Sequence, residues 1–323
     1  MEKGGWGDFH EASKHISMTL PVDPLQWTIG LVGYGEVGRI LAEDLRARGV
    51  ADVLACDINL GGPDEAPLLE HAAKHGVKLT ASHADLASRA DLVISAVTAS
   101  QTIPVAEACA PALRPGAWFL DINSASPGAK IKAAGCIAAV GARFVEGAVM
   151  TSVPPYRIRV PLLLGGPEAA PLMPLLSAFG FEGRVASAKL GVVSATKMCR
   201  SVMIKGLEAM VIESFTAARA YGVEKEVLAS LAETFPGIDW EKQGAYFFQR
   251  VIQHGRRRAE EMCEVAQTVR EAGLEPWSAS GTAARQAWVA DLAERGMLGE
   301  RNLPRKDWRL DADRILATRN DKR

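Results

Sequence analysis

The chain has 323 residues, 48% hydrophobic and 23% charged, and its 37 basic and 38 acidic side chains leave a formal net charge of −1. This length predicts two domains, and the composition is that of an ordinary soluble globular protein. The charge balance gives no electrostatic basis for binding nucleic acid or an anionic membrane, and no apolar run approaches the roughly 20 residues of a membrane helix. Five singly scattered cysteines argue against a disulfide framework or a zinc site, so no metal is expected.

Residues 1–26 show no basic start followed by an apolar core, so they lack the pattern of a secretory signal. We interpret them as a loosely held leader and expect a cytoplasmic protein.

Short apolar runs then alternate with helical segments. Strands are expected at 27–33, 51–57, 77–81, 91–97, 117–123, 142–150 and 160–166. Such alternation is typical of a parallel sheet covered by helices on both faces. After about residue 186 only helical periodicity remains. Helices are expected at 187–221, 224–234, 238–273, 280–294 and 305–319. The predicted fold class is therefore α/β, with a sheet domain over 27–186 followed by an all-helical domain over 187–323.

The sequence GYGEVG directly follows the first expected strand and opens a helix. Its glycines allow a tight turn and a close approach to a pyrophosphate, for which the helix N-terminus offers free N–H groups and a favourable dipole. The expected cofactor-binding residues here are Gly33, Tyr34, Gly35, Glu36, Val37 and Gly38. This context favours a Rossmann-type dinucleotide-binding domain over a glycine-rich turn without a ligand.

Asp57 ends the second expected strand. Its carboxylate is expected to accept hydrogen bonds from the adenosine ribose and to repel a 2′-phosphate. Ile58 and Asn59 supply no arginine for such a phosphate, so the expected cofactor is NAD rather than NADP. Thr98 follows the strand DLVISAV, either as a cofactor contact or as a cap of the turn.

The segment after Gly191 has the pattern of a helix enclosed by protein. One of its faces carries Ser194, Lys197, Ser201, Lys205 and Glu208. Because an unpaired buried charge is costly, the two lysines must meet partners, water or a ligand. Periodicity alone leaves a solvated edge or structural ion pairs open.

The GYGEVG turn, the DINSASPG segment at 121–128 and a long helix opened by G-x-x-x-x-x-K together resemble the β-hydroxyacid dehydrogenases, which include β-hydroxyisobutyrate, tartronate semialdehyde and phosphogluconate dehydrogenases. The resemblance covers about residues 27–222. The C-terminal part, with its HGRRRAEEM segment, resembles a smaller branch whose C-terminal domain long had no assigned function. In the family, the lysine that matches Lys197 is the catalytic acid/base. Desolvation and a second cation, Lys205, would both lower its pKa. Lys205 is also a candidate substrate contact.

The resemblance further implies that Asn123 and Ser124 lie by the nicotinamide ribose and the substrate, with a capped loop as the alternative. Two departures affect the substrate site. The family's two asparagines after the lysine are Arg200 and Ser201 here, and Ser201 can still hydrogen-bond a substrate. The family's Ser-Gly-Gly after the strand FVEGAVM is replaced by a segment that contains Thr151, a candidate substrate contact. These departures suggest a different or bulkier substrate.

The segment IQHGRRRAEEM is helical. Its i,i+4 pairs are Arg256–Glu260 and Arg257–Glu261. They favour an exposed, salt-bridged face. The alternative assigns His254 and Arg258 to the substrate, because the matching helix of the family approaches the active site and an arginine there could bind a carboxylate. The helical half also offers apolar surface for a homodimer, which the family commonly forms.

The sequence thus predicts an NAD-dependent dehydrogenase that oxidises a secondary alcohol of a β-hydroxyacid-like small molecule, or catalyses the reverse reduction. An imine reductase on the same fold is one alternative, although those relatives typically replace the lysine. The other is a non-catalytic NAD-binding sensor, which would explain the departures but not the retained lysine.

Overall fold

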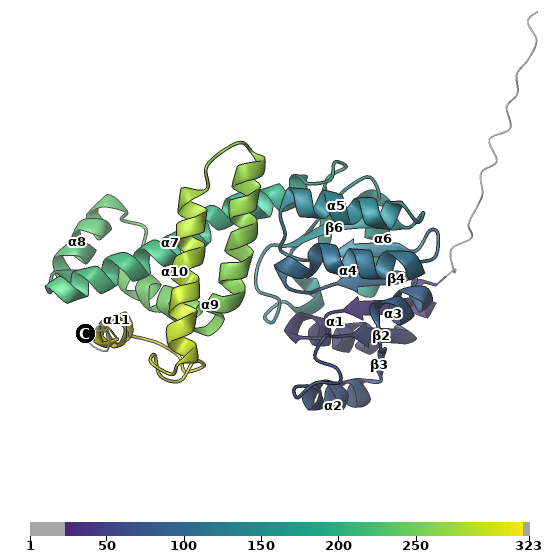
Figure 1. Cartoon of the computed structure of the whole chain (residues 1–323), viewed down its shortest axis with the longest axis horizontal. Coiled ribbons are helices and arrows are strands. Elements are labelled where there is room, and N and C mark those ends of the chain that lie inside the picture. Colours follow the sequence, from purple (N-terminus) through teal and green to yellow (C-terminus); the bar gives the residue numbers. More distant parts are fainter. Residues whose placement is uncertain (1–22, 319–323) are drawn as a thin grey trace, which may run out of the picture.

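A computed structural model describes residues 23–318 and shows a sheet domain followed by a bundle of helices (Figure 1). The expected leader lies outside the described residues up to position 22. Its last part, Pro24–Gln26, forms the short 3₁₀ helix η1, begun by Asp23, whose carboxylate accepts a hydrogen bond from the backbone N–H of Leu25 at 3.0 Å.

The sheet has eight strands in the order β3-β2-β1-β4-β5-β6-β7-β8. They are β1 Thr28–Val32, β2 Asp52–Cys56, β3 Lys78–Leu79, β4 Leu92–Ser95, β5 Trp118–Asp121, β6 Arg143–Val149, β7 Leu162–Gly165 and β8 Gly183–Ser187. β1 to β6 are parallel, whereas β7 runs antiparallel to β6. The predicted parallel sheet is therefore right except for this pair. The sequence missed β8 because this edge strand is largely exposed and shows no buried apolar run.

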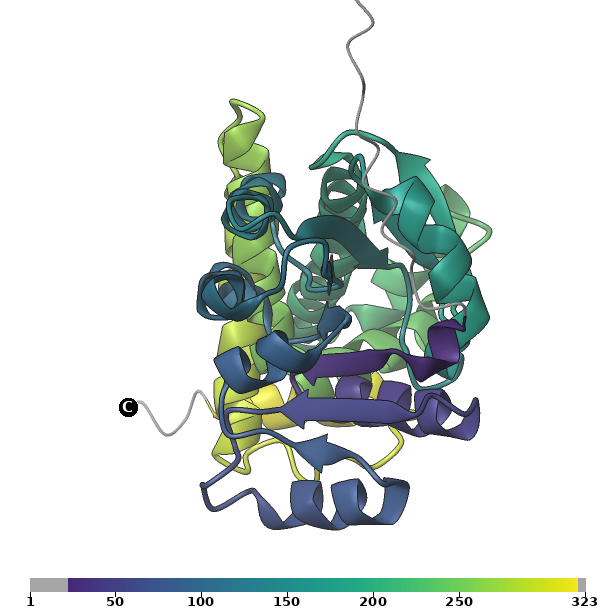
Figure 2. The ribbon, with the colours of Figure 1, turned by 90° about the vertical axis from the view of Figure 1, so that its right-hand side faces the viewer.

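Helices cover both faces of the sheet, as Figure 2 shows. They are α1 Glu36–Ala47, α2 Ala66–His75, α3 His83–Arg89, α4 Thr102–Cys109, α5 Pro127–Ala138 and α6 Ala169–Phe179. α1, α2 and α6 enclose one apolar core, and α3, α4 and α5 enclose the other. The strand order reverses between β1 and β4, and ligands of open α/β sheets bind at the carboxyl ends of strands at such a point.

Five helices follow the sheet. They are α7 Val192–Tyr221, α8 Glu224–Thr234, α9 Trp240–Glu271, α10 Trp277–Glu294 and α11 Trp308–Ala317. All five were predicted, although α7 begins later than expected because β8 and Gly191, with a φ of 85°, precede it. Their common core contains Phe215, Phe248 and Trp308. The predicted Rossmann-type sheet domain and helical C-terminal domain are thus confirmed as the fold class.

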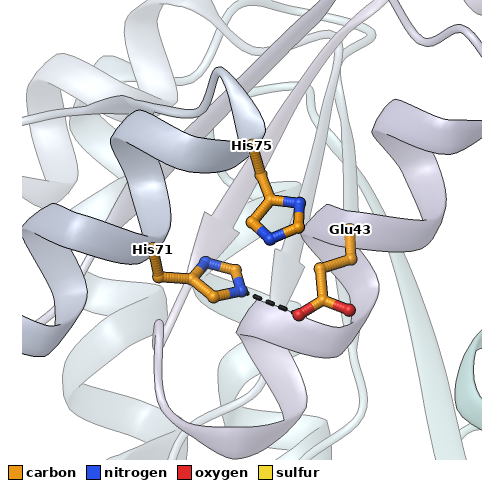
Figure 3. Close-up of side chains that lie close together, drawn as sticks. All are labelled: Glu43, His71 and His75. Atoms are coloured by element: carbon orange, nitrogen blue, oxygen red, sulfur yellow. Dashed lines mark hydrogen bonds and ion pairs between the residues drawn. The ribbon is translucent and has the colours of Figure 1, made fainter.

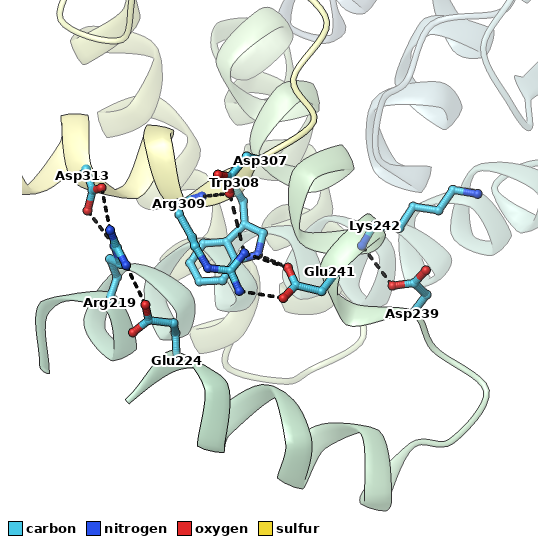
Figure 4. A network of polar contacts seen from close by, with 9 residues as sticks. All are labelled: Arg219, Glu224, Asp239, Glu241, Lys242, Asp307, Trp308, Arg309 and Asp313. Carbon is cyan, nitrogen blue, oxygen red and sulfur yellow. Dashed lines mark hydrogen bonds and ion pairs between the residues drawn. The ribbon is translucent and has the colours of Figure 1, made fainter. Parts of the chain in front are cut away.

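Ion pairs join the helix ends at the side of the bundle away from the sheet (Figures 1 and 4). Arg219 of α7 donates to Asp313 of α11 at 2.8 Å and to Glu224 of α8 at 2.6 Å. Arg309 of α11 pairs with Glu241 of α9 at 2.6 Å. A single exposed ion pair contributes little to folding stability, but this set of pairs links four helices in one network.

No helix within residues 23–318 combines the length and the apolar character that crossing a membrane requires.

Candidate functional site

The glycine turn leaves room for a ligand at one position and none at the other two. A Cβ on Gly38 would lie 2.0 Å from the carbonyl oxygen of Gly33, and one on Gly33, where φ is +92°, would lie 2.5 Å from the carbonyl oxygen of Ala96. A Cβ on Gly35 would meet nothing within 4 Å. Gly35 is also the N-cap of α1, and no side chain caps this helix. The open space and the uncapped N-terminus fit a pyrophosphate.

Asp57 lies beside this turn, directly after β2. One carboxylate oxygen accepts from the backbone N–H of Tyr34 at 2.6 Å and the other from that of Asn59 at 2.9 Å. The ring of Tyr34 is buried, and its hydroxyl hydrogen-bonds His71 of α2. Because its ring is buried, only the backbone of Tyr34 is left to contact a cofactor at the turn.

Three further predicted residues lie at the ends of strands. Thr98 is exposed and makes no side-chain cap, so the alternative of a capped turn does not hold for it. Asn123 is buried; its amide accepts from the N–H of Val97 at 2.7 Å and donates to the hydroxyl of Ser95 at 2.9 Å. The Asn123 side chain thus joins the ends of β4 and β5, as the alternative of a structural loop implies. Thr151 lies exposed just beyond β6.

The side chain of Lys197 connects α7 to the loop that follows β5. Its ammonium nitrogen donates to the hydroxyl oxygen of Ser124 at 2.6 Å, from α7 to the loop after β5. Burial lowers the pKa of Lys197 to about 8; Glu261 opposes this shift, and Lys205 adds to it. The structure therefore brings together a lysine whose pKa lies near the physiological range and a serine hydroxyl.

Lys205 and Ser201 are buried on the same face of α7. Lys205 forms an ion pair with Glu261 of α9 at 2.5 Å, and burial lowers its pKa. Burial alone would raise the pKa of Glu261, but Lys205 and Lys197 lower it to about 2. The structure thus selects one of the open alternatives for Lys205, an ion pair with a carboxylate.

Sequence reasoning missed Glu261, which it assigned to an exposed pair with Arg257. That pair is long, at 4.0 Å. Spacing along α9 does not distinguish Glu261 from Glu260, and only the packing of α9 against α7 places it by the lysines.

Arg258 is buried against Glu208 of α7, with its Nε 3.1 Å from one carboxylate oxygen. Because its guanidinium is paired with Glu208, the expectation that Arg258 is free to bind a substrate carboxylate is wrong. Arg256 pairs with Asp291 and with Glu294 of α10, so its predicted pair along α9 is also wrong.

His254 is partly buried on α9. Burial lowers its pKa, neighbouring arginines lower it further, and Glu36 at the start of α1 opposes them.

Glu146 was also missed. Its buried carboxylate accepts from the backbone N–H of Gly191 at 2.7 Å and from that of Ser194 at 2.5 Å. It therefore caps the first turn of α7 and fixes this helix, with Lys197, on β6. The signal was present, since Glu146 is a charged residue inside the otherwise apolar strand FVEGAVM.

The fold and the turn define a dinucleotide-binding protein of the dehydrogenase type, and comparisons with known proteins agree. Residues 28–124 match the family described as NADP oxidoreductase, coenzyme F420-dependent, and residues 218–289 match the Domain of unknown function (DUF1932). An uncharacterized 28.5 kDa protein of Methanothermus fervidus is 30% identical over 255 residues, which are 77% of this chain and 93% of that one.

Solved structures extend the comparison. A conserved hypothetical protein from Sinorhizobium meliloti is 36% identical with a TM-score of 0.70, over 90% of this chain and 97% of that one. A conserved protein of unknown function, described as similar to 3-hydroxyacid dehydrogenases, is 30% identical with a TM-score of 0.63, over 83% and 99%. The 3-hydroxyisobutyrate dehydrogenase of Mycobacterium tuberculosis shares the fold at 17% identity, with a TM-score of 0.62 over 90% and 99%.

The chain therefore belongs to the family that joins an NAD(P)-binding Rossmann domain to this helical domain of unknown function. Its structural neighbours are 3-hydroxyacid dehydrogenases, which confirms the resemblance drawn from the sequence.

The glycine turn gives a paired prediction. Gly35→Ala should keep the wild-type melting temperature, because φ is −73° and the new Cβ meets no protein atom, yet it should weaken dinucleotide binding by filling the space for the pyrophosphate. Gly38→Ala, the matched control for backbone crowding, should lower the melting temperature. Thermal unfolding and cofactor titration measure both effects; wild-type affinity in Gly35→Ala would contradict this assignment.

Proposed function

We propose that the protein is an NAD-dependent dehydrogenase that oxidises a secondary alcohol of a β-hydroxyacid-like substrate, or catalyses the reverse reduction, with Lys197 as general acid/base. The observation that carries this proposal is the 2.6 Å contact between Lys197 and Ser124, made by a lysine whose pKa is lowered to about 8. A group with such a pKa can both accept and donate a proton near the operating pH.

Lys197 and Ser124 have different roles in the proposed reaction. Neutral Lys197 accepts the proton of the substrate hydroxyl, and Ser124, within hydrogen-bond reach of the same amine, orients that hydroxyl. Bound NAD would supply the acceptor for the hydride that leaves the carbon bearing this hydroxyl. In the reverse direction, the ammonium of Lys197 donates its proton to the oxygen as negative charge develops on it. Lys205, held by Glu261, keeps a cation near Lys197 and so favours the neutral amine.

Other predicted substrate contacts keep supporting roles. Ser201 lies one turn after Lys197 on the same face of α7, Thr151 lies just beyond the end of β6, and His254 lies on α9, the helix that carries Glu261. We assign them to substrate positioning rather than to proton transfer.

The cofactor preference rests on Asp57. A carboxylate after β2 repels a 2′-phosphate, and the next side chain, Ile58, is 90% exposed and uncharged. NAD should therefore bind more tightly than NADP, measured for both by protein fluorescence. Asp57→Ser combined with Ile58→Arg should narrow or reverse this preference, whereas Asp64→Ser, an exposed aspartate of the same domain, should not. Equal affinities in the wild type would contradict the role of Asp57.

Removal of the lysine tests the mechanism. Lys197→Ala should lower kcat by about 10²–10⁴-fold, the usual contribution of general acid/base catalysis, with nearly unchanged NAD affinity. Lys197→Arg should not restore turnover, because arginine stays protonated. Lys189→Ala, an exposed lysine just before α7, is the control and should keep wild-type kcat. A folded Lys197→Ala protein that turns over normally would remove the proposed role.

The pH dependence of kcat tests how Glu261 and Lys205 act on the pKa of Lys197. Alcohol oxidation needs the neutral amine, so kcat should rise as the pH increases through about 8, and the reverse reduction should fall over the same range. Glu261 raises the pKa of Lys197 and Lys205 lowers it. Glu261→Gln should therefore move the profile to lower pH and Lys205→Ala to higher pH, by roughly one unit each. Shifts in the same direction would contradict this arrangement.

One substrate panel separates the dehydrogenase from its alternatives. The fold is shared with a reductive aminase from Aspergillus terreus at 18% identity and a TM-score of 0.52, so imines belong on the panel beside hydroxyacids, aryl alcohols and polyols. Turnover of imines alone would favour an imine reductase. Cofactor binding without turnover of any class would favour the NAD-sensing alternative.

We also propose that the chain forms a homodimer through its helical domain. α7 exposes Met203 at 71%, Met210 at 59% and Tyr221 at 84% of their surfaces. A cavity of about 490 Å³ lies beside this helix, between α7, α10 and α11. Such apolar exposure is typical of a surface covered by a partner.

A further inference from the structure

A histidine-rich cluster lies on the sheet domain, and no step proposed above uses it. His71 and His75 lie one turn apart on α2, and Glu43 faces them from α1, with the three side chains pointing toward one another (Figure 3). Their ligand atoms lie within 4.8 Å of one another. Two imidazoles and one carboxylate, with water as a fourth ligand, are a ligand set that proteins use for zinc.

His71 is oriented as a metal ligand would be. One ring nitrogen, Nδ1, hydrogen-bonds the hydroxyl of the buried Tyr34 at 2.8 Å, and the other, Nε2, lies 2.9 Å from Oε1 of Glu43. Metal-ligating histidines almost always use their second nitrogen for such a supporting hydrogen bond, which fixes the ring and its tautomer. The rings of His71 and His75 are stacked, with centroids 4.5 Å apart.

The charges of the cluster suit a cation. The carboxylate of Glu43 is paired with the guanidinium of Arg157. Arg157 binds the far oxygen, Oε2, at 2.5 Å and also contacts Asp44 at 2.8 Å, which leaves Oε1 turned toward the histidines. Two carboxylates and one guanidinium leave one net negative charge beside two imidazoles.

We propose that Glu43, His71 and His75 bind a zinc-class divalent metal ion, through Nε2 of His71, one ring nitrogen of His75 and Oε1 of Glu43. Zinc–ligand bonds of about 2.0–2.1 Å in a tetrahedral arrangement separate neighbouring ligand atoms by roughly 3.3 Å. The present separation of 2.9 Å between His71 and Glu43 needs to open by only a few tenths of an ångström. Magnesium should not compete, because it prefers all-oxygen octahedral sites.

The site reaches the dinucleotide-binding turn through one residue. Tyr34 follows Gly33, donates its backbone N–H to Asp57, and holds His71 with its hydroxyl. A metal ion bound by Glu43, His71 and His75 would link α2 to α1. It would also fix the ring of His71, which hydrogen-bonds the hydroxyl of Tyr34. This site is separate from Lys197, and its existence does not depend on the proposed reaction.

Zinc titration of the metal-stripped full-length chain tests the proposal by calorimetry. The wild type should bind one zinc ion with saturation, and zinc should raise its melting temperature, while magnesium should do neither. The double variant His71→Ala/His75→Ala should lose this binding. Tyr34→Phe, which removes only the supporting hydroxyl, should weaken it by roughly 10–100-fold.

Two further variants separate loss of the metal site from the loss of any histidine and from loss of the fold. His83→Ala removes a histidine of α3 outside the cluster and should bind zinc as the wild type does. Glu43→Gln keeps the shape of the side chain but removes its charge, so it should weaken zinc binding even if the double variant fails to fold. The proposal is overturned if the wild type shows no saturable binding, or if the double variant, or Glu43→Gln, binds zinc with wild-type affinity.

Discussion

A buried carboxylate at the start of α7 is the contact on which the arrangement of the site depends. Glu146 lies inside β6, and its two oxygens accept from the backbone of Gly191 and Ser194. Free N–H groups and the helix dipole at an N-terminus favour a negative charge, so the carboxylate is stabilised although it is buried. Because α7 is the helix that leads out of the sheet domain, this cap fixes where its lysines lie relative to the strand ends.

A second helix completes the connection. α9 sends two carboxylates to the first turn of α5: Glu264 accepts from the N–H of Ser126 at 2.8 Å and Glu271 from that of Gly128 at 2.9 Å. A third carboxylate of α9, Glu261, pairs with Lys205. The same helix therefore binds the loop that carries Ser124 and neutralises one of two neighbouring lysines, so the chemistry of Lys197 depends on how α7, α9 and that loop assemble.

The lowered pKa of Lys197 follows from this assembly. Burial favours the neutral amine, and Glu261 limits the shift that burial and Lys205 would otherwise produce. Beneath the site, Lys130 and Asp121 form a buried ion pair at 2.9 Å, and Lys130 is a further cation that favours the neutral form of Lys197. Burial, together with charged side chains on α5, α7 and α9, thus sets the proton affinity of Lys197.

The sequence by itself determined the fold class, the glycine turn and the lysine-bearing face of α7, because helix and strand periodicity and the turn's glycines are local properties of the chain. It could not determine that β7 runs antiparallel to β6, that Arg258 is occupied by Glu208, or that Glu261 lies by Lys205. Nor could it bring Glu43 to His71 and His75. These contacts join elements far apart in the chain, and only tertiary packing decides which charged side chains become neighbours and which remain in solvent.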